Sequence, residues 1–206
     1  MTLLIVDYGM GNLHSVERAF GEQGAKTLIS ADPAAITAVA GIVIPGVGSF
    51  AEGMRNLRAS GMADAIIKAA QDESVPVLGI CLGMQLLASR GWEGGDTPGL
   101  NLIPGEVRPL VALAGERIPH VGWNEVHFTR EDGIVFKLRD ESDFYFVHSY
   151  AFATENPADI VAQTPYCGGF TSIVGKGAVR GVQFHPERSA KAGARLIQNF
   201  LTLCHS

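Results

Sequence analysis

Short apolar runs recur along the first half of the chain, and this recurrence limits the fold more than any other feature. They cover residues 3–6, 27–30, 41–44 and 75–80, each the length of one short strand. An unbroken apolar run is typical of a parallel strand that is covered on both faces. The connecting segments carry helix signals. Asn12 suits the N-cap of a helix that ends at Gly24. Ser49 and Glu52 have capping-box spacing at the start of a helix that ends at Gly61.

The second half of the chain is richer in strands. We expect strands at residues 118–126, 144–150, 160–164 and 178–184, and a closing helix over residues 191–203. This order predicts an α/β fold with an open, mostly parallel sheet, helices on both faces and an antiparallel extension. In such sheets the functional residues lie at the carboxyl ends of the strands.

The composition predicts one folded domain over residues 1–206. Of these residues, 47% are hydrophobic and 18% are charged, which is enough apolar material for a substantial core. The net charge is −5, and Lys and Arg are spread along the chain, so we expect no nucleic-acid partner. The apolar stretch at the amino terminus is too short for a signal peptide or a membrane span, so we expect no membrane association.

Cysteine and glycine spacing narrows the chemistry further. The three cysteines, Cys81, Cys167 and Cys204, match neither a disulfide framework nor a zinc site. We therefore expect a reducing, cytoplasmic setting and no metal. The glycine-rich segments 9–11 and 45–48 match neither the dinucleotide-binding fingerprint nor the P-loop, so we expect no cofactor.

The strongest functional motif is Gly79-Ile80-Cys81-Leu82-Gly83, which directly follows an apolar run. A nucleophile flanked by glycines at the end of a buried strand is the pattern of a nucleophile elbow, here with a thiol. We expect a helix over residues 82–89, so that Cys81 lies at its positive end. The alternative is that Cys81 is a small buried hydrophobe, as free cysteines often are.

A second motif, His185-Pro186-Glu187, follows another short strand. In an extended chain the side chains at i and i+2 project to one face, and Pro186 favours an extended His185. We therefore expect Glu187 to orient the imidazole of His185, which completes a nucleophile, base and acid. Taken alone, the motif is also typical of a strand-to-helix turn, but together with the elbow it favours catalysis.

With these motifs the chain resembles the class I, or triad, glutamine amidotransferases. Within that family it is similar to the glutaminase subunits of imidazole glycerol phosphate synthases, and the similarity spans essentially the whole chain. The motifs that support it are Asp7-Tyr8-Gly9-Met10-Gly11-Asn12, Pro45-Gly46-Val47-Gly48, Pro119-His120-Val121-Gly122-Trp123-Asn124 and Phe144-Tyr145-Phe146-Val147-His148-Ser149-Tyr150.

The resemblance implies a role for each matching residue. Cys81 would attack the side-chain amide of L-glutamine, His185 would pass a proton to the leaving ammonia, and Glu187 would orient His185. The backbone amides of Val47 and Leu82 would form the oxyanion hole, after the Gly46-Val47 peptide has reoriented. The positions implied to hold glutamine are Gly48, Gln85, Glu93, His148, Ser149 and Tyr150.

The resemblance also implies a partner, because no part of the chain is left over for a synthase domain. That partner is a cyclase subunit with a (β/α)8 barrel, which forms a heterodimer with this chain and receives the ammonia. The residues implied at the junction are Asn12, Pro119, His120, Trp123 and Arg188. Trp123 also fits an ordinary core aromatic, and His120 a hydrogen-bonded buried residue.

Two other functions remain open. A related glutaminase could supply a pyridoxal phosphate synthase or a synthase of sugar biosynthesis. Residues 45–48 and 119–124 argue against the first of these clients but do not exclude the second. A non-catalytic redox or stress sensor could also carry a cysteine on an elbow, although it would need neither the His185-Pro186-Glu187 motif nor Gln85.

Overall fold

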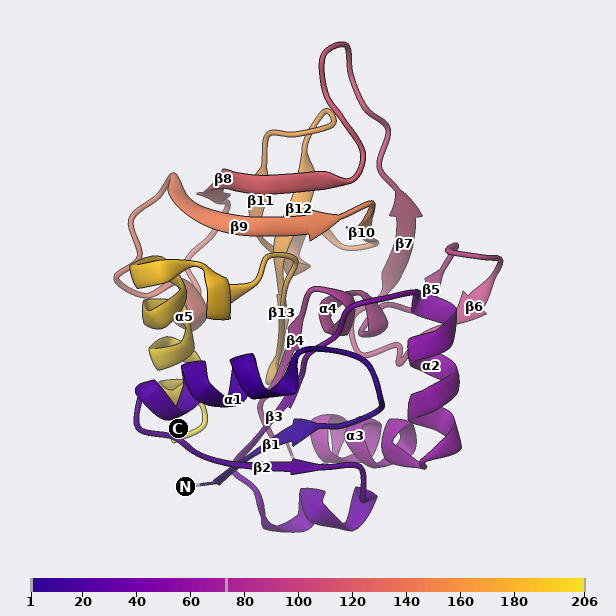
Figure 1. The fold of residues 1–206 in the computed structure, drawn as a ribbon, viewed down its shortest axis with the longest axis vertical. Coiled ribbons are helices and arrows are strands. Elements are labelled where there is room, and N and C mark those ends of the chain that lie inside the picture. Colours follow the sequence, from indigo (N-terminus) through magenta and orange to yellow (C-terminus); the bar gives the residue numbers. More distant parts are fainter. Residues whose placement is uncertain (1, 73, 206) are drawn as a thin grey trace.

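The computed structural model describes residues 2–72 and 74–205, in which a long mixed sheet lies between two groups of helices (Figure 1). Its strands are β1 (Thr2–Val6), β2 (Lys26–Ser30), β3 (Gly41–Ile44), β4 (Val77–Ile80), β5 (Arg90–Gly91), β6 (Thr97–Pro98), β7 (Gly105–Pro109), β8 (His120–Phe128), β9 (Ser142–His148), β10 (Tyr150–Thr154), β11 (Ile160–Thr164), β12 (Phe170–Lys176) and β13 (Val179–Val182). The α-helices are α1 (Leu13–Glu22), α2 (Phe50–Ala59), α3 (Met62–Gln71), α4 (Leu82–Leu86) and α5 (Ala190–Leu203). Short 3-10 helices are η1 (Pro33–Ala38), η2 (Gly133–Val135), η3 (Pro157–Asp159) and η4 (Pro186–Arg188).

The sheet has a parallel half and a largely antiparallel half. Strands β2, β1, β3, β4 and β13 lie in that order with parallel pairing throughout. Beyond β13 come β12, β10 and β7 with antiparallel pairing, then β5 and the edge strand β6. Strand β11 joins β12 to β8, and β8 pairs with β9. The predicted α/β class with an antiparallel extension is confirmed.

Alternate residues of the parallel strands pack into two separate cores, one on each face of the sheet. Leu4 and Ile42 belong to the core beneath α2 and α3. Leu3 and Val43 belong to the core beneath α1 and α5, where the rings of Phe20 and Phe200 meet edge to face. Figure 1 shows these helix pairs on opposite sides of the strands. Burial on both faces explains why β1, β3 and β4 are apolar without alternation. The same expectation is wrong for residues 27–30, because β2 is an edge strand whose residues are exposed or half-buried.

The predicted start signals of both helices are confirmed. The side chain of Asn12 accepts a hydrogen bond from the Ser15 backbone N–H at 3.2 Å, and α1 begins at the next residue, Leu13. The Ser49 hydroxyl accepts from the Glu52 backbone N–H at 3.4 Å at the start of α2. Each cap satisfies an amide that has no partner within its helix.

Several predicted strand bounds differ from the structure by a few residues, since β4 is Val77–Ile80, β8 is His120–Phe128 and β13 is Val179–Val182. In two further places distant segments compete for the backbone. Helix α4 ends at Leu86 rather than at residue 89. The carbonyls of Leu86, Leu87 and Ala88 accept hydrogen bonds from the backbone of residues 100–103, which fixes the chain in a turn. The strand predicted over residues 144–150 is divided at Ser149, because β9 pairs with β8 whereas β10 pairs with β7.

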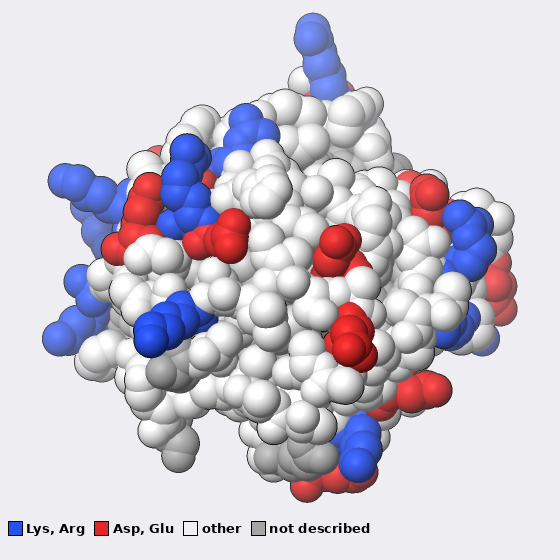
Figure 2. Space-filling model, turned by 60° about the horizontal axis from the view of Figure 1, so that its bottom comes forward, with Lys and Arg blue, Asp and Glu red and all other residues white. Residues whose placement is uncertain are grey.

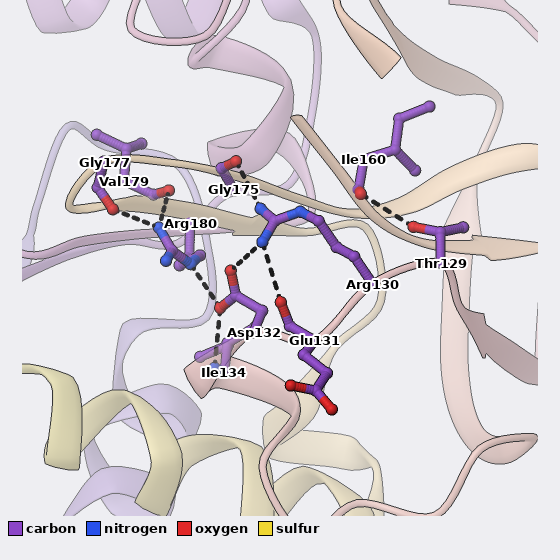
Figure 3. Close-up of polar contacts among 10 residues, drawn as sticks. All are labelled: Thr129, Arg130, Glu131, Asp132, Ile134, Ile160, Gly175, Gly177, Val179 and Arg180. Carbon is purple, nitrogen blue, oxygen red and sulfur yellow. Dashed lines mark hydrogen bonds and ion pairs between the residues drawn. The ribbon is translucent and has the colours of Figure 1, made fainter. Parts of the chain in front are cut away.

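A buried charged cluster fastens the loop between β8 and β9 to the beginning of β13 (Figure 3). Asp132 contacts Arg130 at 2.9 Å and Arg180 at 2.8 Å, and its side chain is only 2% exposed. Burial alone would raise the pKa of Asp132, but the hydrogen bond from Arg180 and the two positive charges hold that pKa below its usual value. The cluster therefore fixes the start of the strand whose far end leads to His185.

The face drawn in Figure 2 carries no large field of one sign. Lys and Arg lie mostly near its edges, and Asp and Glu lie both among them and nearer the centre. Among the described residues, no helix has the length and apolar character needed to cross a membrane.

Candidate active site

Cys81 stands at a sharp turn between β4 and α4. Its backbone has φ +55° and ψ −110°, a conformation that L-residues rarely adopt. Both flanking glycines are required by close packing, since a Cβ on Gly83 would collide with the Ile44 carbonyl and one on Gly79 with the Gly83 backbone. The Cys81 N–H donates to the Val182 carbonyl at 2.8 Å, which places the elbow beside the end of β13. The predicted strand–elbow–helix geometry is confirmed.

His185 and Glu187 form the expected contact, but the chain reaches it differently. Nδ1 of His185 lies 2.8 Å from Oε1 of Glu187, and both side chains are buried. His185 is extended, whereas Pro186 opens the 3-10 turn η4, so the predicted extended dyad is wrong beyond His185. The Arg188 N–H closes this turn by donating to the His185 carbonyl at 3.0 Å. The contact is therefore made by a tight turn and not by the alternation of a strand.

The environment of His185 favours a protonated imidazole. Burial alone would lower its pKa, but the hydrogen bonds and negative charge of Cys81 and Glu187 outweigh that effect and raise the pKa of His185 to about 10. The same contacts link the sulfur of Cys81, the imidazole and the carboxylate in one series. His185 is also held by its backbone, because its N–H donates to the Tyr145 carbonyl at 2.9 Å.

Cys81, His185 and Glu187 line a cavity of about 530 Å³. It lies where the carboxyl ends of the parallel strands meet β9 and β10. The predicted site residues that line it are Asn12, Val47, Gly48, Cys81, Leu82, Gln85, Glu93, Pro119, His148, Ser149, Tyr150, His185, Glu187 and Arg188. The cavity is also lined by Ser15, Val16 and Arg18 of α1, which belong to no motif that predicted a site. Among the described residues, no group of three or more His, Cys, Asp or Glu side chains is placed to hold a metal ion.

One wall of the cavity is the segment that contains Gly46 and Val47. The Leu82 N–H donates to the carbonyl oxygen of Gly46 at 3.3 Å. In a planar trans peptide the C=O and N–H groups point in opposite directions, so the Val47 N–H points away from the Leu82 amide. Only glycine fits at position 46, because a Cβ there would collide with the Tyr8 hydroxyl. That hydroxyl donates to the Pro45 carbonyl at 2.7 Å and holds the segment from below.

Gln85 and Glu93 contribute polar groups to the cavity from different elements. Nε2 of Gln85 donates to the Tyr150 carbonyl at 3.0 Å and to Oε1 of Gln183 at 3.0 Å. Both of its amide hydrogens are therefore used, which leaves its carbonyl oxygen for the cavity. Oε2 of Glu93 accepts the Phe50 N–H at 2.7 Å at the start of α2.

The residues expected at a partner junction fall into two groups. Asn12, Pro119 and Arg188 line the cavity, and Trp123 on β8 is 54% exposed. His120 is only 4% exposed, because its ring lies between Phe146 and Tyr166. Its side chain is thus not available at the surface of this structure.

Gln183 contacts the nucleophile, although no sequence motif predicted a role for it. Its Nε2 lies 3.7 Å from the sulfur of Cys81, and the residue is fully buried. The available signal was a polar residue between Val182 and Phe184, two positions before His185, which is the spacing of side chains on one face of an extended chain.

Comparisons with known proteins agree with this geometry. The model of the family "Glutamine amidotransferase class-I" matches residues 4–204. The chain is 44% identical to imidazole glycerol phosphate synthase subunit HisH of Moorella thermoacetica, over 96% of this chain and 93% of that protein. It is 42% identical to the HisH subunit of Chlorobium chlorochromatii, over 98% of this chain and all of that protein. A crystal structure of a glutamine amidotransferase shares the fold, with a TM-score of 0.77 and 18% identity over 98% of this chain and 99% of that one.

Proposed function

The chain belongs to the class I glutamine amidotransferase family, and from that premise we propose that it is the glutaminase subunit of an imidazole glycerol phosphate synthase. It hydrolyses L-glutamine to glutamate and ammonia and delivers the ammonia to a cyclase subunit with a (β/α)8 barrel. The cyclase uses it to make imidazole glycerol phosphate and an aminoimidazole carboxamide ribotide in histidine biosynthesis. The observation that carries the proposal is the series Cys81, His185 and Glu187 at the base of one cavity.

The reaction begins from a thiolate and an imidazolium. Because its pKa is about 10, His185 holds a proton at neutral pH that it can give away. The Cys81 sulfur attacks the side-chain amide carbon of glutamine, and His185 protonates the departing nitrogen to release ammonia. Neutral His185 then takes a proton from a water molecule as the water oxygen attacks the glutamyl thioester. This step releases glutamate and restores the thiolate. Glu187 keeps Nδ1 of His185 protonated, so that Nε2 performs both transfers.

The oxyanion hole forms in this scheme only after one peptide unit has rotated. In the described conformation the Gly46 carbonyl occupies the Leu82 N–H. Rotation of the Gly46-Val47 peptide frees that amide and brings the Val47 N–H to the same side, so that two donors face the oxyanion. Binding of the cyclase and its nucleotide substrate favours the rotated state by a population shift. Loss of one such donor typically costs about 10² to 10³ in rate, so the unrotated state is expected to turn over slowly.

The substrate is held by the polar groups on the cavity wall. The free carbonyl oxygen of Gln85 and the carboxylate of Glu93 are acceptors that suit the α-ammonium group of glutamine. Gly48 and the segment His148-Ser149-Tyr150 border the same space and complete the glutamine site. The junction with the cyclase is formed by Asn12, Pro119, His120, Trp123 and Arg188. His120 contributes from beneath the surface, because its ring is buried. The three free cysteines fit a reducing cytoplasm.

The proposal is tested by measuring glutamate release from glutamine by the purified chain alone, with the cyclase, and with the cyclase and its nucleotide substrate. Strong stimulation in the last mixture is expected. Equal rates in all three would contradict the gated oxyanion hole and point to another client, such as a paralogous synthase. No release in any mixture would favour a non-catalytic cysteine sensor.

The Cys81→Ala variant in the complex separates the two halves of the reaction. It is expected to abolish synthesis from glutamine and to retain synthesis from an added ammonium salt, because the cyclase chemistry lies on the other chain. Loss of both activities in a complex that still assembles would contradict this division.

A further inference from the structure

Gln183 presents a buried amide to the nucleophile and is not among the residues that line the cavity. The residue follows β13, is fully buried, and places Nε2 at 3.7 Å from the Cys81 sulfur. A buried amide costs free energy unless its polar atoms find partners. Its oxygen accepts a hydrogen bond from Gln85, and its nitrogen contacts the Cys81 sulfur.

One backbone carbonyl fixes which end of this amide faces the sulfur. The Tyr150 carbonyl can only accept a hydrogen bond, so the group of Gln85 that lies 3.0 Å from it is the NH₂ group. The second hydrogen of that NH₂ group reaches Gln183 at 3.0 Å, and the atom that receives it must be the Gln183 oxygen. The NH₂ group of Gln183 therefore points to Cys81. Neither amide can flip without losing a buried hydrogen bond.

We propose that Gln183 is a positioning residue of the glutaminase reaction: its amide donates a hydrogen bond to the Cys81 sulfur, favours the thiolate and keeps it aimed at the cavity. Gln85 has a second task beside its place in the glutamine site, because it locks the Gln183 amide in the donating orientation. This inference rests on the proposed function, in which Cys81 is the nucleophile.

The other groups around the sulfur show why such a donor matters. The Val147 carbonyl lies 3.7 Å from the sulfur on the cavity side and accepts the S–H of the neutral thiol, so it favours the thiol. His185 favours the thiolate through its positive charge and its hydrogen bond. Tyr8 and His148 lie nearby but are neutral at working pH, because burial raises the pKa of Tyr8 and lowers that of His148 to about 4. Gln183 thus joins His185 against the pull of the Val147 carbonyl.

The test is the pH dependence of Cys81 alkylation by iodoacetamide, followed by mass spectrometry so that Cys167 and Cys204 are counted separately. In Gln183→Met, which keeps the length but loses the donor, the midpoint pH is expected to rise by about one unit, a roughly tenfold smaller thiolate fraction below the midpoint. Gln183→Asn keeps an amide but withdraws it by one methylene and is expected to shift the midpoint in the same direction. Gln198→Met is the matched control, because the amide of Gln198 lies on the surface of α5 and contacts Gln23.

A purely structural role would lower the melting temperature of the Gln183 variants without moving the midpoint, and that result would overturn the inference. If Gln183→Met does not fold, Gln183→Asn and Gln85→Met give the same reading. Gln85→Met removes the amide that orients Gln183 together with a contact to Tyr150 and part of the glutamine site, but alkylation by iodoacetamide requires no bound glutamine. The proposed function fails by a different result, the absence of glutaminase activity in the wild-type complex. The alkylation midpoint is measured on the chain itself and does not depend on that activity.

Discussion

Nε2 of His148 lies 3.0 Å from Nδ1 of His120, and both rings are buried. Nδ1 of His148 lies 2.9 Å from the Tyr150 carbonyl oxygen, which can only accept, so His148 carries its proton on Nδ1. Its Nε2 therefore accepts from Nδ1 of His120. Nε2 of His120 is left unprotonated and accepts from the Asn124 amide at 3.2 Å. The Tyr150 carbonyl thus fixes the tautomers of both rings and ties the cavity wall to β8.

Because this pair is neutral, the protein is expected to lose stability in acid. Burial, aided by the charges of His120 and His185 and opposed by the hydrogen bond to Tyr150, lowers the pKa of His148 to about 4. The unfolded chain keeps a pKa near 6.5, so it binds a proton that the folded state refuses. The free energy of unfolding is therefore highest above about pH 6.5. It declines by on the order of 2–3 kcal/mol as the pH falls toward the pKa of His148 in the folded state.

Urea unfolding of the wild type and of His148→Asn, from about pH 8 to about pH 4, measures this contribution. The wild type is expected to lose stability more steeply than the variant. His127→Asn serves as a control of opposite sign, because the hydrogen bond to Glu125 raises the pKa of His127 at an exposed site. Parallel curves for the wild type and His148→Asn would show that His148 does not titrate as described.

Glu187→Gln tests the orienting carboxylate. The variant keeps the size of the side chain but removes the negative charge 2.8 Å from Nδ1 of His185, so the pKa of His185 should fall and the wrong tautomer become accessible. By analogy with other triads, kcat should drop by about 10² to 10⁴, with a smaller change in KM. Steady-state glutaminase assays of the stimulated complex give both constants. Glu17→Gln is the control, because Glu17 contacts His14 on the surface of α1, and an equal loss in both variants would argue against a specific role.

Local sequence was sufficient for the elbow but not for the rest of the cavity. The turn at Cys81 is encoded by an apolar strand, two glycines and a following helix, all within a few residues. The contact of His185 with Glu187 was also predicted, although the chain makes it through a turn that Pro186 begins. The cavity wall formed by residues 148–150 depends on where β9 and β10 pair with other strands. No local pattern specifies that register.

The same distinction between local and distant determinants explains which strands could be predicted from the sequence. Strands β1, β3 and β4 were found because burial on both faces leaves a continuous apolar signature, as at residues 41–44. Strands β7 and β10 were missed, because they pair with each other across a long stretch of sequence. Strand β12 pairs with its sequence neighbours β11 and β13 and was missed because Thr171, Ser172 and Gly175 interrupt its apolar pattern. His120 was expected at a junction, but its burial is set by Phe146 and Tyr166, which reach it from other segments.

Asp132→Asn should destabilise the fold without reaching the reaction. The substitution removes the negative charge shared by Arg130 and Arg180 and leaves two buried or half-buried cations close together (Figure 3). We expect a loss of about 2 kcal/mol, less than for a fully buried pair because Arg130 reaches solvent. Urea unfolding measures the loss, and kcat of the folded variant should stay unchanged because the cluster lies at the opposite end of β13 from His185. Glu131→Gln is the control, since that carboxylate points away from both arginines in Figure 3, and equal stability of the two variants would contradict the prediction.

Trp123→Ala tests the junction with the cyclase. The indole is 54% exposed on β8 and packs edge to face on Tyr145, whose ring also lies 4.3 Å from the Arg188 guanidinium. An exposed aromatic held in place by its neighbours is a typical binding hot spot, so its loss should weaken cyclase binding by about 2 kcal/mol, or roughly thirtyfold. Because half of the ring is already in water, the stability of the isolated chain should change little.

Isothermal titration of the cyclase into each variant gives the dissociation constant directly. Phe136→Ala is the matched control, because Phe136 is 61% exposed on the loop between β8 and β9 and is not part of the proposed junction. If Trp123→Ala binds like the wild type while Phe136→Ala does not, the interface lies over that loop and the proposed junction is wrong. If only Trp123→Ala is weakened, the cyclase covers the strand that also carries His120 and Asn124. The series of hydrogen bonds that joins Asn124, His120, His148 and Tyr150 then extends from beneath the interface to the glutamine site.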